Sequence, residues 1–173
     1  MTQMWADANR ADPPGVAGER ETLTAFLDWH RETLAVKCAD LTAEQLNERA
    51  VPPSGLSLHG LVRHLAGVER WWLRIQFAGE QLPLLHYSDD DPEQDFERLD
   101  GDFAEALDTW RRECDRSREI VAGAASLDET GIRRSTGEPV TLRWVLLHLL
   151  AEYARHNGHV DLLRERLDGG VGR

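Results

Sequence analysis

Lysine is almost absent from this chain, cysteine is rare, and no long hydrophobic run occurs. Lys37 is the only lysine among 20 basic residues, and the formal net charge is −11. A nucleic-acid surface needs clustered positive charge, so we expect no nucleic-acid partner. A membrane-spanning helix needs roughly 20 apolar residues in succession. No run approaches that length, and we expect no membrane association.

The two cysteines, Cys38 and Cys114, do not form a CxxC pair. Two distant thiols of this kind are typical of buried, reduced side chains. The first residues, MTQMWADANRADPPG, lack the basic start and apolar stretch of a secretory signal. We therefore expect a cytoplasmic protein.

The composition is that of one globular domain, with 41% hydrophobic and 29% charged residues over 173 positions. Pro13, Pro14 and Gly15 predict an irregular lead-in over residues 1–17. The domain itself is expected over 18–167, followed by a flexible tail over 168–173.

Apolar residues recur at three- and four-residue steps in four segments, which predict helices over about 19–38, 57–78, 95–121 and 141–167. Ser57 and Thr141 are good helix N-caps. A short helical turn is expected at 42–47 and loops at 80–94 and 123–140, with no convincing strand. Four amphipathic helices predict an all-α four-helix bundle, since each apolar face needs partners.

Glu152 and His156 lie inside the apolar stripe of the last helix, four residues apart and on one face. Burying either group without a partner would be costly. On the second helix, His64 lies near the edge of the apolar stripe, whereas His59 lies nearly opposite and is expected to face solvent. His64, Glu152 and His156 could therefore form a three-ligand site for Zn²⁺, Ni²⁺ or Fe²⁺.

The same residues also allow a site without metal, because Glu152 and His156 could form a buried salt bridge. His148 and His159 lie near the edge of the stripe and are candidate partners of the ligands. Helical angles suggest that the open side of the site is lined by four further residues: His30, His59, Trp71 and Tyr153. His30, on the core face of the first helix, could equally be structural.

Three segments, FLDWHRETL, LSLHGLVRHLAGVERWW and TLRWVLLHLLAEYARHNGHVDLLRE, resemble the DinB/YfiT-like superfamily of metal-dependent proteins. The resemblance is to a compact subgroup related to the N-terminal domain of mycothiol-dependent maleylpyruvate isomerase. It implies a DinB-like four-helix bundle with metal ligands at His64 and His156. Many relatives have histidine at the position of Glu152. The isomerase resembles this chain in having glutamate there, in a His, Glu, His set that holds zinc, and this favours zinc over nickel.

The resemblance implies a thiol-dependent transferase or isomerase that acts on a small-molecule substrate through a metal-activated thiolate of mycothiol or bacillithiol. In this mechanism His64, Glu152 and His156 would be ligands only, and no catalytic residue is identified. Two alternatives remain: a metal-dependent hydrolase that activates water, and a non-catalytic metal-binding or structural bundle. The resemblance also implies a homodimer, which Leu146, Leu150 and Tyr153 outside the main stripe could form, unless they pack on the loops.

Overall fold

The computed structural model describes residues 10–91 and 93–171, so residues 1–9 of the expected lead-in and 172–173 of the expected tail lie outside it. The prediction of a mostly helical bundle is confirmed. The elements in chain order are α1 (Glu19–Lys37), α2 (Ala43–Asn47), α3 (Leu58–Glu69), the π-helical η1 (Arg70–Phe77), α4 (Gln94–Glu97), α5 (Phe103–Gly123), β1 (Thr130–Ile132), β2 (Pro139–Thr141) and α6 (Leu142–Asp168).

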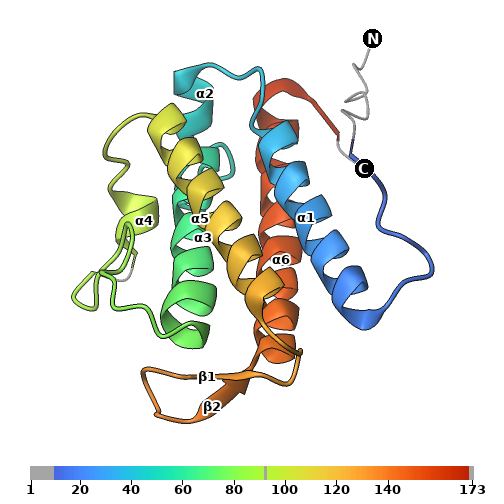
Figure 1. The fold of residues 1–173 in the computed structure, drawn as a ribbon. Coiled ribbons are helices and arrows are strands. Elements are labelled where there is room, and N and C mark those ends of the chain that lie inside the picture. Colours follow the sequence, from blue (N-terminus) through green and yellow to red (C-terminus); the bar gives the residue numbers. More distant parts are fainter. Residues whose placement is uncertain (1–9, 92, 172–173) are drawn as a thin grey trace.

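The bundle is built from two helix pairs, α1 with α6 and α3 with α5, and α3 also packs on α6 (Figure 1). Leucines from the long helices form the centre of the core, where their side chains are almost wholly buried. The three residues that the sequence predicts as metal ligands lie where α3 faces α6. Among the described residues, no helix combines the length and hydropathy needed to cross a bilayer.

Side-chain caps define where the long helices begin. The hydroxyl of Ser57 accepts a hydrogen bond from the Gly60 amide, and the hydroxyl of Thr141 accepts one from the Trp144 amide. Both predicted N-caps are therefore confirmed. Each cap satisfies an amide that has no partner within the helix, and such a cap contributes about 1 kcal/mol.

The third long helix begins later than the sequence predicts. The chain forms the short helix α4 and then leaves helical geometry before α5 begins at Phe103. Gly101 has a φ of 78°, a conformation that ends a helical path, and the Asp102 side chain caps α5 by accepting from the Glu105 amide. The prediction of one helix from residue 95 was therefore wrong, and Asp95 belongs to a separate element.

The predicted loop over 123–140 contains a small antiparallel hairpin, so the expectation of no strand was also wrong. β1 pairs with β2, with Gly131 opposite Val140. The hairpin lies against η1, where the Gln76 side chain accepts a hydrogen bond of 2.7 Å from the Arg134 amide. Strands of three residues are too short for an alternating pattern to reveal.

Replacing Gly131 by alanine is expected to destabilise the protein by about 1–3 kcal/mol, because the new methyl group would overpack a tight backbone contact. An ideal Cβ at Gly131 would lie 2.3 Å from Cα of Phe77 and 2.4 Å from the Gln76 carbonyl oxygen. Urea unfolding measures the loss. The control is Gly123→Ala, where nothing lies within 4 Å of an added Cβ. Equal stability of the two variants would contradict this close approach.

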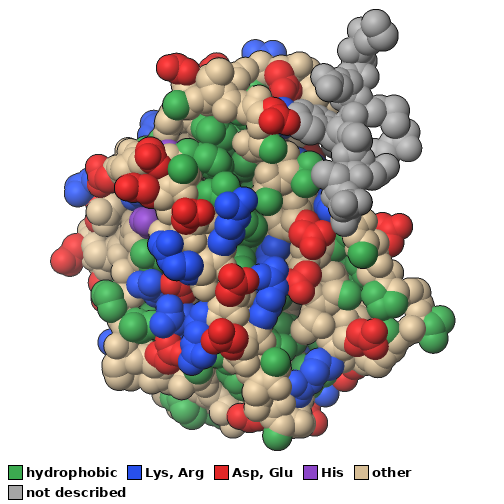
Figure 2. Space-filling model, turned by 45° about the horizontal axis from the view of Figure 1, so that its top comes forward, with side chains coloured by type: hydrophobic (Ala, Val, Ile, Leu, Met, Phe, Trp, Pro, Cys, Tyr) green, Lys and Arg blue, Asp and Glu red, His purple; other side chains and the backbone are tan. Residues whose placement is uncertain are grey.

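Charges of both signs are interspersed over the face shown in Figure 2. Arginines on α5 pair with acids from other segments: Arg116 lies 2.7 Å from Glu80, and Arg118 lies 3.0 Å from Asp28. Because Arg116 and Arg118 are exposed and their acidic partners are partly exposed, each pair adds little to stability.

The side chains of Leu146 and Tyr153 are wholly buried in the core. The suggestion that they lie on a surface between two copies was therefore wrong.

Candidate metal centre

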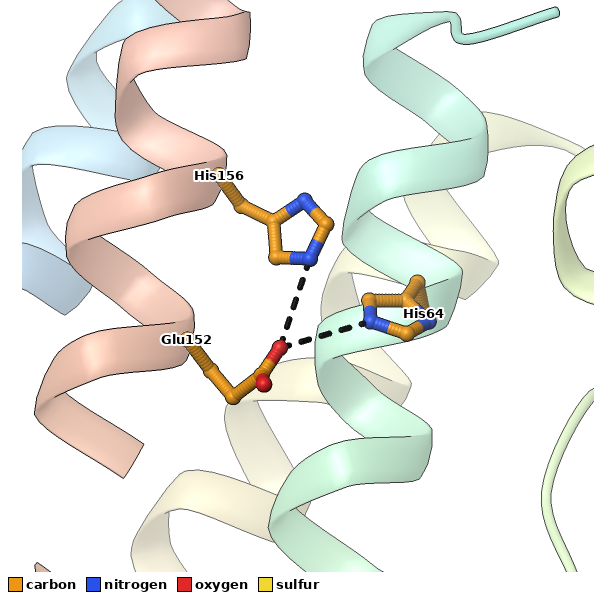
Figure 3. A group of neighbouring side chains, drawn as sticks. All are labelled: His64, Glu152 and His156. Atoms are coloured by element: carbon orange, nitrogen blue, oxygen red, sulfur yellow. Dashed lines mark ion pairs between the residues drawn. The ribbon is translucent and has the colours of Figure 1, made fainter. Parts of the chain in front are cut away.

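His64 projects from α3 towards α6, and Glu152 and His156 project from successive turns of α6 towards it (Figure 3). His156 Nε2 lies 3.4 Å from Glu152 Oε2, and His64 Nε2 lies 4.0 Å from the same oxygen. The His64 and His156 rings are 4.7 Å apart between centroids. The structure thus brings together the three residues that the sequence singled out.

The spacing of these donor atoms suits a divalent cation. One nitrogen or oxygen atom from each residue lies within 4.8 Å of the others. Two donors that share a tetrahedral zinc ion at 2.0–2.2 Å stand about 3.4 Å apart. Separations of 3.4 and 4.0 Å are longer than good hydrogen bonds, so the donors face one another without being joined tightly. Two imidazoles and one carboxylate are also a common ligand set of catalytic zinc.

The cluster is buried enough to strengthen electrostatic interactions, yet each of its three side chains keeps some contact with solvent. The side chains of His156, Glu152 and His64 are 9, 15 and 23% exposed. The neighbouring imidazoles of His156 and His64 hold the pKa of Glu152 well below its usual range. Burial lowers the pKa of His64, but the Asp95 and Glu152 carboxylates outweigh burial and raise it to about 9. Glu152 therefore carries the negative charge that attracts a cation.

Two of the predicted neighbours lie beside the cluster. His148 Nε2 is 3.6 Å from Glu152 Oε1, so it contacts the carboxylate oxygen opposite to the one that faces His64 and His156. The His148 ring also stacks on Trp144 at 5.0 Å, and Trp72 contacts it at 4.4 Å. His159 Nδ1 lies 3.3 Å from His156 Nδ1. These contacts restrict the orientations of Glu152 and His156.

The other predicted neighbours lie elsewhere. His59 is fully buried rather than solvent-facing, because Asn47 and Phe103 cover that side of α3; its Nδ1 lies 2.8 Å from Asn47 Oδ1. His30 is half-buried, and its carbonyl accepts a hydrogen bond from Asn157, which favours the structural interpretation. Trp71 is half-buried in η1, and its neighbour Trp72 is the ring that contacts His148.

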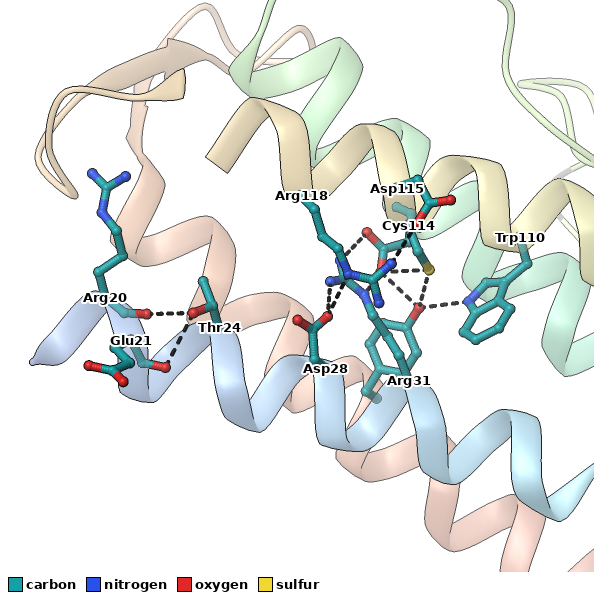
Figure 4. Close-up of polar contacts among 11 residues, drawn as sticks. Arg20, Glu21, Thr24, Asp28, Arg31, Trp110, Cys114, Asp115 and Arg118 are labelled. Atoms are coloured by element: carbon teal, nitrogen blue, oxygen red, sulfur yellow. Dashed lines mark hydrogen bonds and ion pairs between the residues drawn. The ribbon is translucent and has the colours of Figure 1, made fainter. Parts of the chain in front are cut away.

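Tyr153 is wholly buried and belongs to a polar network that includes Trp110 and Cys114, both of which Figure 4 labels. Its hydroxyl donates to Glu69 Oε1 and accepts from the Trp110 indole, both at 2.8 Å. Arg31 donates to both oxygens of Glu69, at 2.8 and 2.7 Å. Sequence reasoning missed this network, because its members come from four different helices.

Cys114 approaches the same network, with its sulfur 3.7 Å from Glu69 Oε1. Burial raises the pKa of its thiol well above the usual value, and burial also raises the pKa of Cys38 to about 12. Both cysteines are free and buried, as predicted. Because neither thiol readily ionises, neither is suited to be a nucleophile.

Two residues that the sequence analysis did not select, Asp95 and Phe96, contact His64. Asp95 Oδ2 lies 2.8 Å from His64 Nδ1, and the Phe96 ring stacks on the imidazole at 4.9 Å. Both come from α4. Sequence analysis missed them because it placed Asp95 at the start of the third long helix, 31 residues from His64.

Comparison with known proteins adds a family match and a structural match. The family model described as mycothiol-S-transferase matches residues 22–169, and no curated protein sequence matches the chain. The crystal structure of a conserved protein from Enterococcus faecalis has a TM-score of 0.66 and 15% sequence identity. The alignment covers 89% of this chain and 99% of that one. At that identity the match shows a shared fold alone.

Proposed function

The chain belongs to the mycothiol-S-transferase family, which is DinB/YfiT-like, and on that basis we propose that it joins mycothiol to a small electrophile at a metal centre. His64, Glu152 and His156 would hold the metal. The observation that carries the proposal is the convergence of these three side chains from α3 and α6, of which His64 and Glu152 are partly exposed to solvent. The donor set favours zinc.

A divalent ion at such a site supplies a Lewis acid, which lowers the pKa of a coordinating thiol and so produces a nucleophile at neutral pH. In the transfer itself, the thiol sulfur forms a bond to an electrophilic carbon. The leaving group departs with the bonding electrons, and the thiol proton passes to solvent. No cysteine of the chain takes part, because Cys38 and Cys114 are buried with raised pKa values.

In this mechanism the residues of the chain would bind the metal and orient its ligands. His64 and His156 present ring nitrogens, and Glu152 presents one carboxylate oxygen to both of them. His148 contacts the second oxygen of Glu152 and so limits rotation of the carboxylate. Trp144, 38% exposed, stacks on His148, and the Arg133 guanidinium lies over the Trp144 ring 4.3 Å from its centroid, so Trp144 helps to hold His148 in place beside Glu152.

Activity is expected to require both the metal and the thiol. The assay follows reaction of 1-chloro-2,4-dinitrobenzene with mycothiol, in the purified protein and after removal of metal by a chelator. We expect the enzymatic rate to fall to the uncatalysed rate on chelation and to return when Zn²⁺ is added.

Three outcomes would count against this proposal. Full activity in the metal-free protein would exclude a role for the metal. Turnover of an ester or amide without any thiol would favour metal-assisted hydrolysis. Metal binding without turnover of any thiol would leave a metal-binding protein that is not an enzyme. Bacillithiol, tested in parallel, shows which of the two thiols the site prefers.

A further inference from the structure

One face of α3 is occupied by the segment that carries α4. Gly60, His64 and Gly67 follow one another at steps of four and three residues, so they lie on this single face. A Cβ at Gly60 would lie 3.3 Å from the Phe96 ring, and one at Gly67 would lie 3.0 Å from the Leu85 carbonyl oxygen. The two glycines therefore allow Phe96 and Leu85 to approach the α3 backbone on both sides of His64.

This approach buries Asp95 against His64. Asp95 is 2% exposed, and its Oδ2 lies 2.8 Å from His64 Nδ1. Its second oxygen, Oδ1, is also buried and has no hydrogen-bond partner within the described part of the chain. Burying a carboxylate is costly. Because the one side-chain hydrogen bond that Asp95 makes among the described residues goes to His64, its burial indicates a role towards that histidine.

The contact with Asp95 determines which nitrogen of His64 is available. When Nδ1–H donates to the carboxylate, the lone pair of the neutral ring lies on Nε2. Nε2 is the atom that faces Glu152, 4.0 Å away. The Phe96 ring stacks on the imidazole with 28° between the planes and opposes rotation of the ring.

We infer that Asp95 is a positioning residue that orients His64 and fixes its Nδ1–H tautomer, so that Nε2 is presented to a metal. The inference rests on the proposed metal centre and adds to it a carboxylate on a separate short helix. Carboxylates that hold a histidine ligand in this way typically change metal affinity 10–100-fold. α4 is then part of the metal centre, although it supplies no ligand.

The test measures the dissociation constant for Zn²⁺ by competition with a fluorescent chelator. The proteins compared are the wild type, Asp95→Ala, Asp95→Asn and the control Glu97→Gln, which removes an exposed charge from the same helix. We expect Asp95→Ala to bind about 10–100-fold more weakly than the wild type. Asp95→Asn, whose amide oxygen can still accept from Nδ1–H, should lose less, and Glu97→Gln should match the wild type.

A second readout separates positioning from a general loss of structure. In the Co²⁺-loaded wild type, the Nδ1 proton of His64 should give a strongly shifted proton NMR signal that exchanges slowly with water. The signal should disappear or exchange rapidly in Asp95→Ala and persist in Glu97→Gln. If the alanine variant does not fold, Asp95→Asn compared with Glu97→Gln decides the matter.

The outcomes distinguish this inference from the proposed function. A wild type that binds neither Zn²⁺ nor Co²⁺ overturns the proposed metal centre, and the inference with it. If the wild type binds Zn²⁺ and both Asp95 variants bind it as tightly as the wild type does, the inference about Asp95 is overturned and the proposed metal centre stands.

Discussion

Replacing Glu152 by glutamine is expected to weaken Zn²⁺ binding by more than about 100-fold. Loss of a residue that only supports a ligand weakens binding by up to about 100-fold, and loss of a ligand itself should cost more. The substitution keeps the shape of the side chain but removes the negative charge from between His64 and His156. Two neutral imidazoles and a neutral amide are a much weaker ligand set for a divalent cation. Elemental analysis and chelator competition measure the loss, and thiol-transfer activity should fall with the bound metal.

The matched control is Glu165→Gln, which removes an exposed carboxylate from the same helix without touching the cluster. It should bind metal as the wild type does. Equal metal content in Glu152→Gln and the wild type would show that Glu152 is not a ligand. A wild type that contains no metal and takes up none would instead favour a hydrogen-bonded core cluster without metal.

Replacing Glu69 by glutamine is expected to destabilise the fold by about 3–5 kcal/mol, because the buried Arg31 guanidinium loses its buried counter-charge. It keeps an ion pair of 2.9 Å with Asp28, whose side chain is 38% exposed and whose charge is therefore screened by solvent. Arg31 and Glu69 are 3 and 0% exposed. The Tyr153 hydroxyl, which donates to Glu69, would also lose its charged acceptor. Urea unfolding measures the effect, and Glu32→Gln, an exposed position on α1, is the control.

The contribution of Glu69 should depend on pH in a defined direction. Burial alone would raise the pKa of Glu69, but the Arg31 charge and the hydrogen bonds from Arg31 and Tyr153 together outweigh burial and lower it from the usual 4.5. A lowered pKa in the folded state means that the stabilisation is present above pH 4.5 and is lost as the pH falls through the lowered value. The stability difference between the wild type and Glu69→Gln should therefore shrink in acid. A difference that grew in acid, or one below about 1 kcal/mol at neutral pH, would contradict the assigned ion pair.

Patterns among residues close together in the sequence were sufficient to predict most of the helices. The spacing of apolar residues located the four long helices, and the hydroxyls of Ser57 and Thr141 identified two helix starts. The same periodicity placed Glu152 and His156 inside an apolar stripe and selected His64 over His59, and the three chosen side chains converge in the structure. These features depend on residues three or four apart, where helical geometry alone relates one side chain to the next.

Contacts between distant segments decided the rest. The side of α3 that carries His59 looked exposed because the helix was considered alone, whereas Asn47 and Phe103 cover it. The ion pair of Arg31 and Glu69 joins α1 to α3, and no local pattern relates residues 38 positions apart.

The same limit applies at the candidate metal centre. The sequence by itself identified the three candidate ligands, His64, Glu152 and His156, and the two helices that carry them. Only the tertiary structure decided that α4 separates from α5 at Gly101 and folds back on α3, where Asp95 meets His64. A hydrogen bond across 31 residues depends on how the chain packs, and helical periodicity carries no information about it.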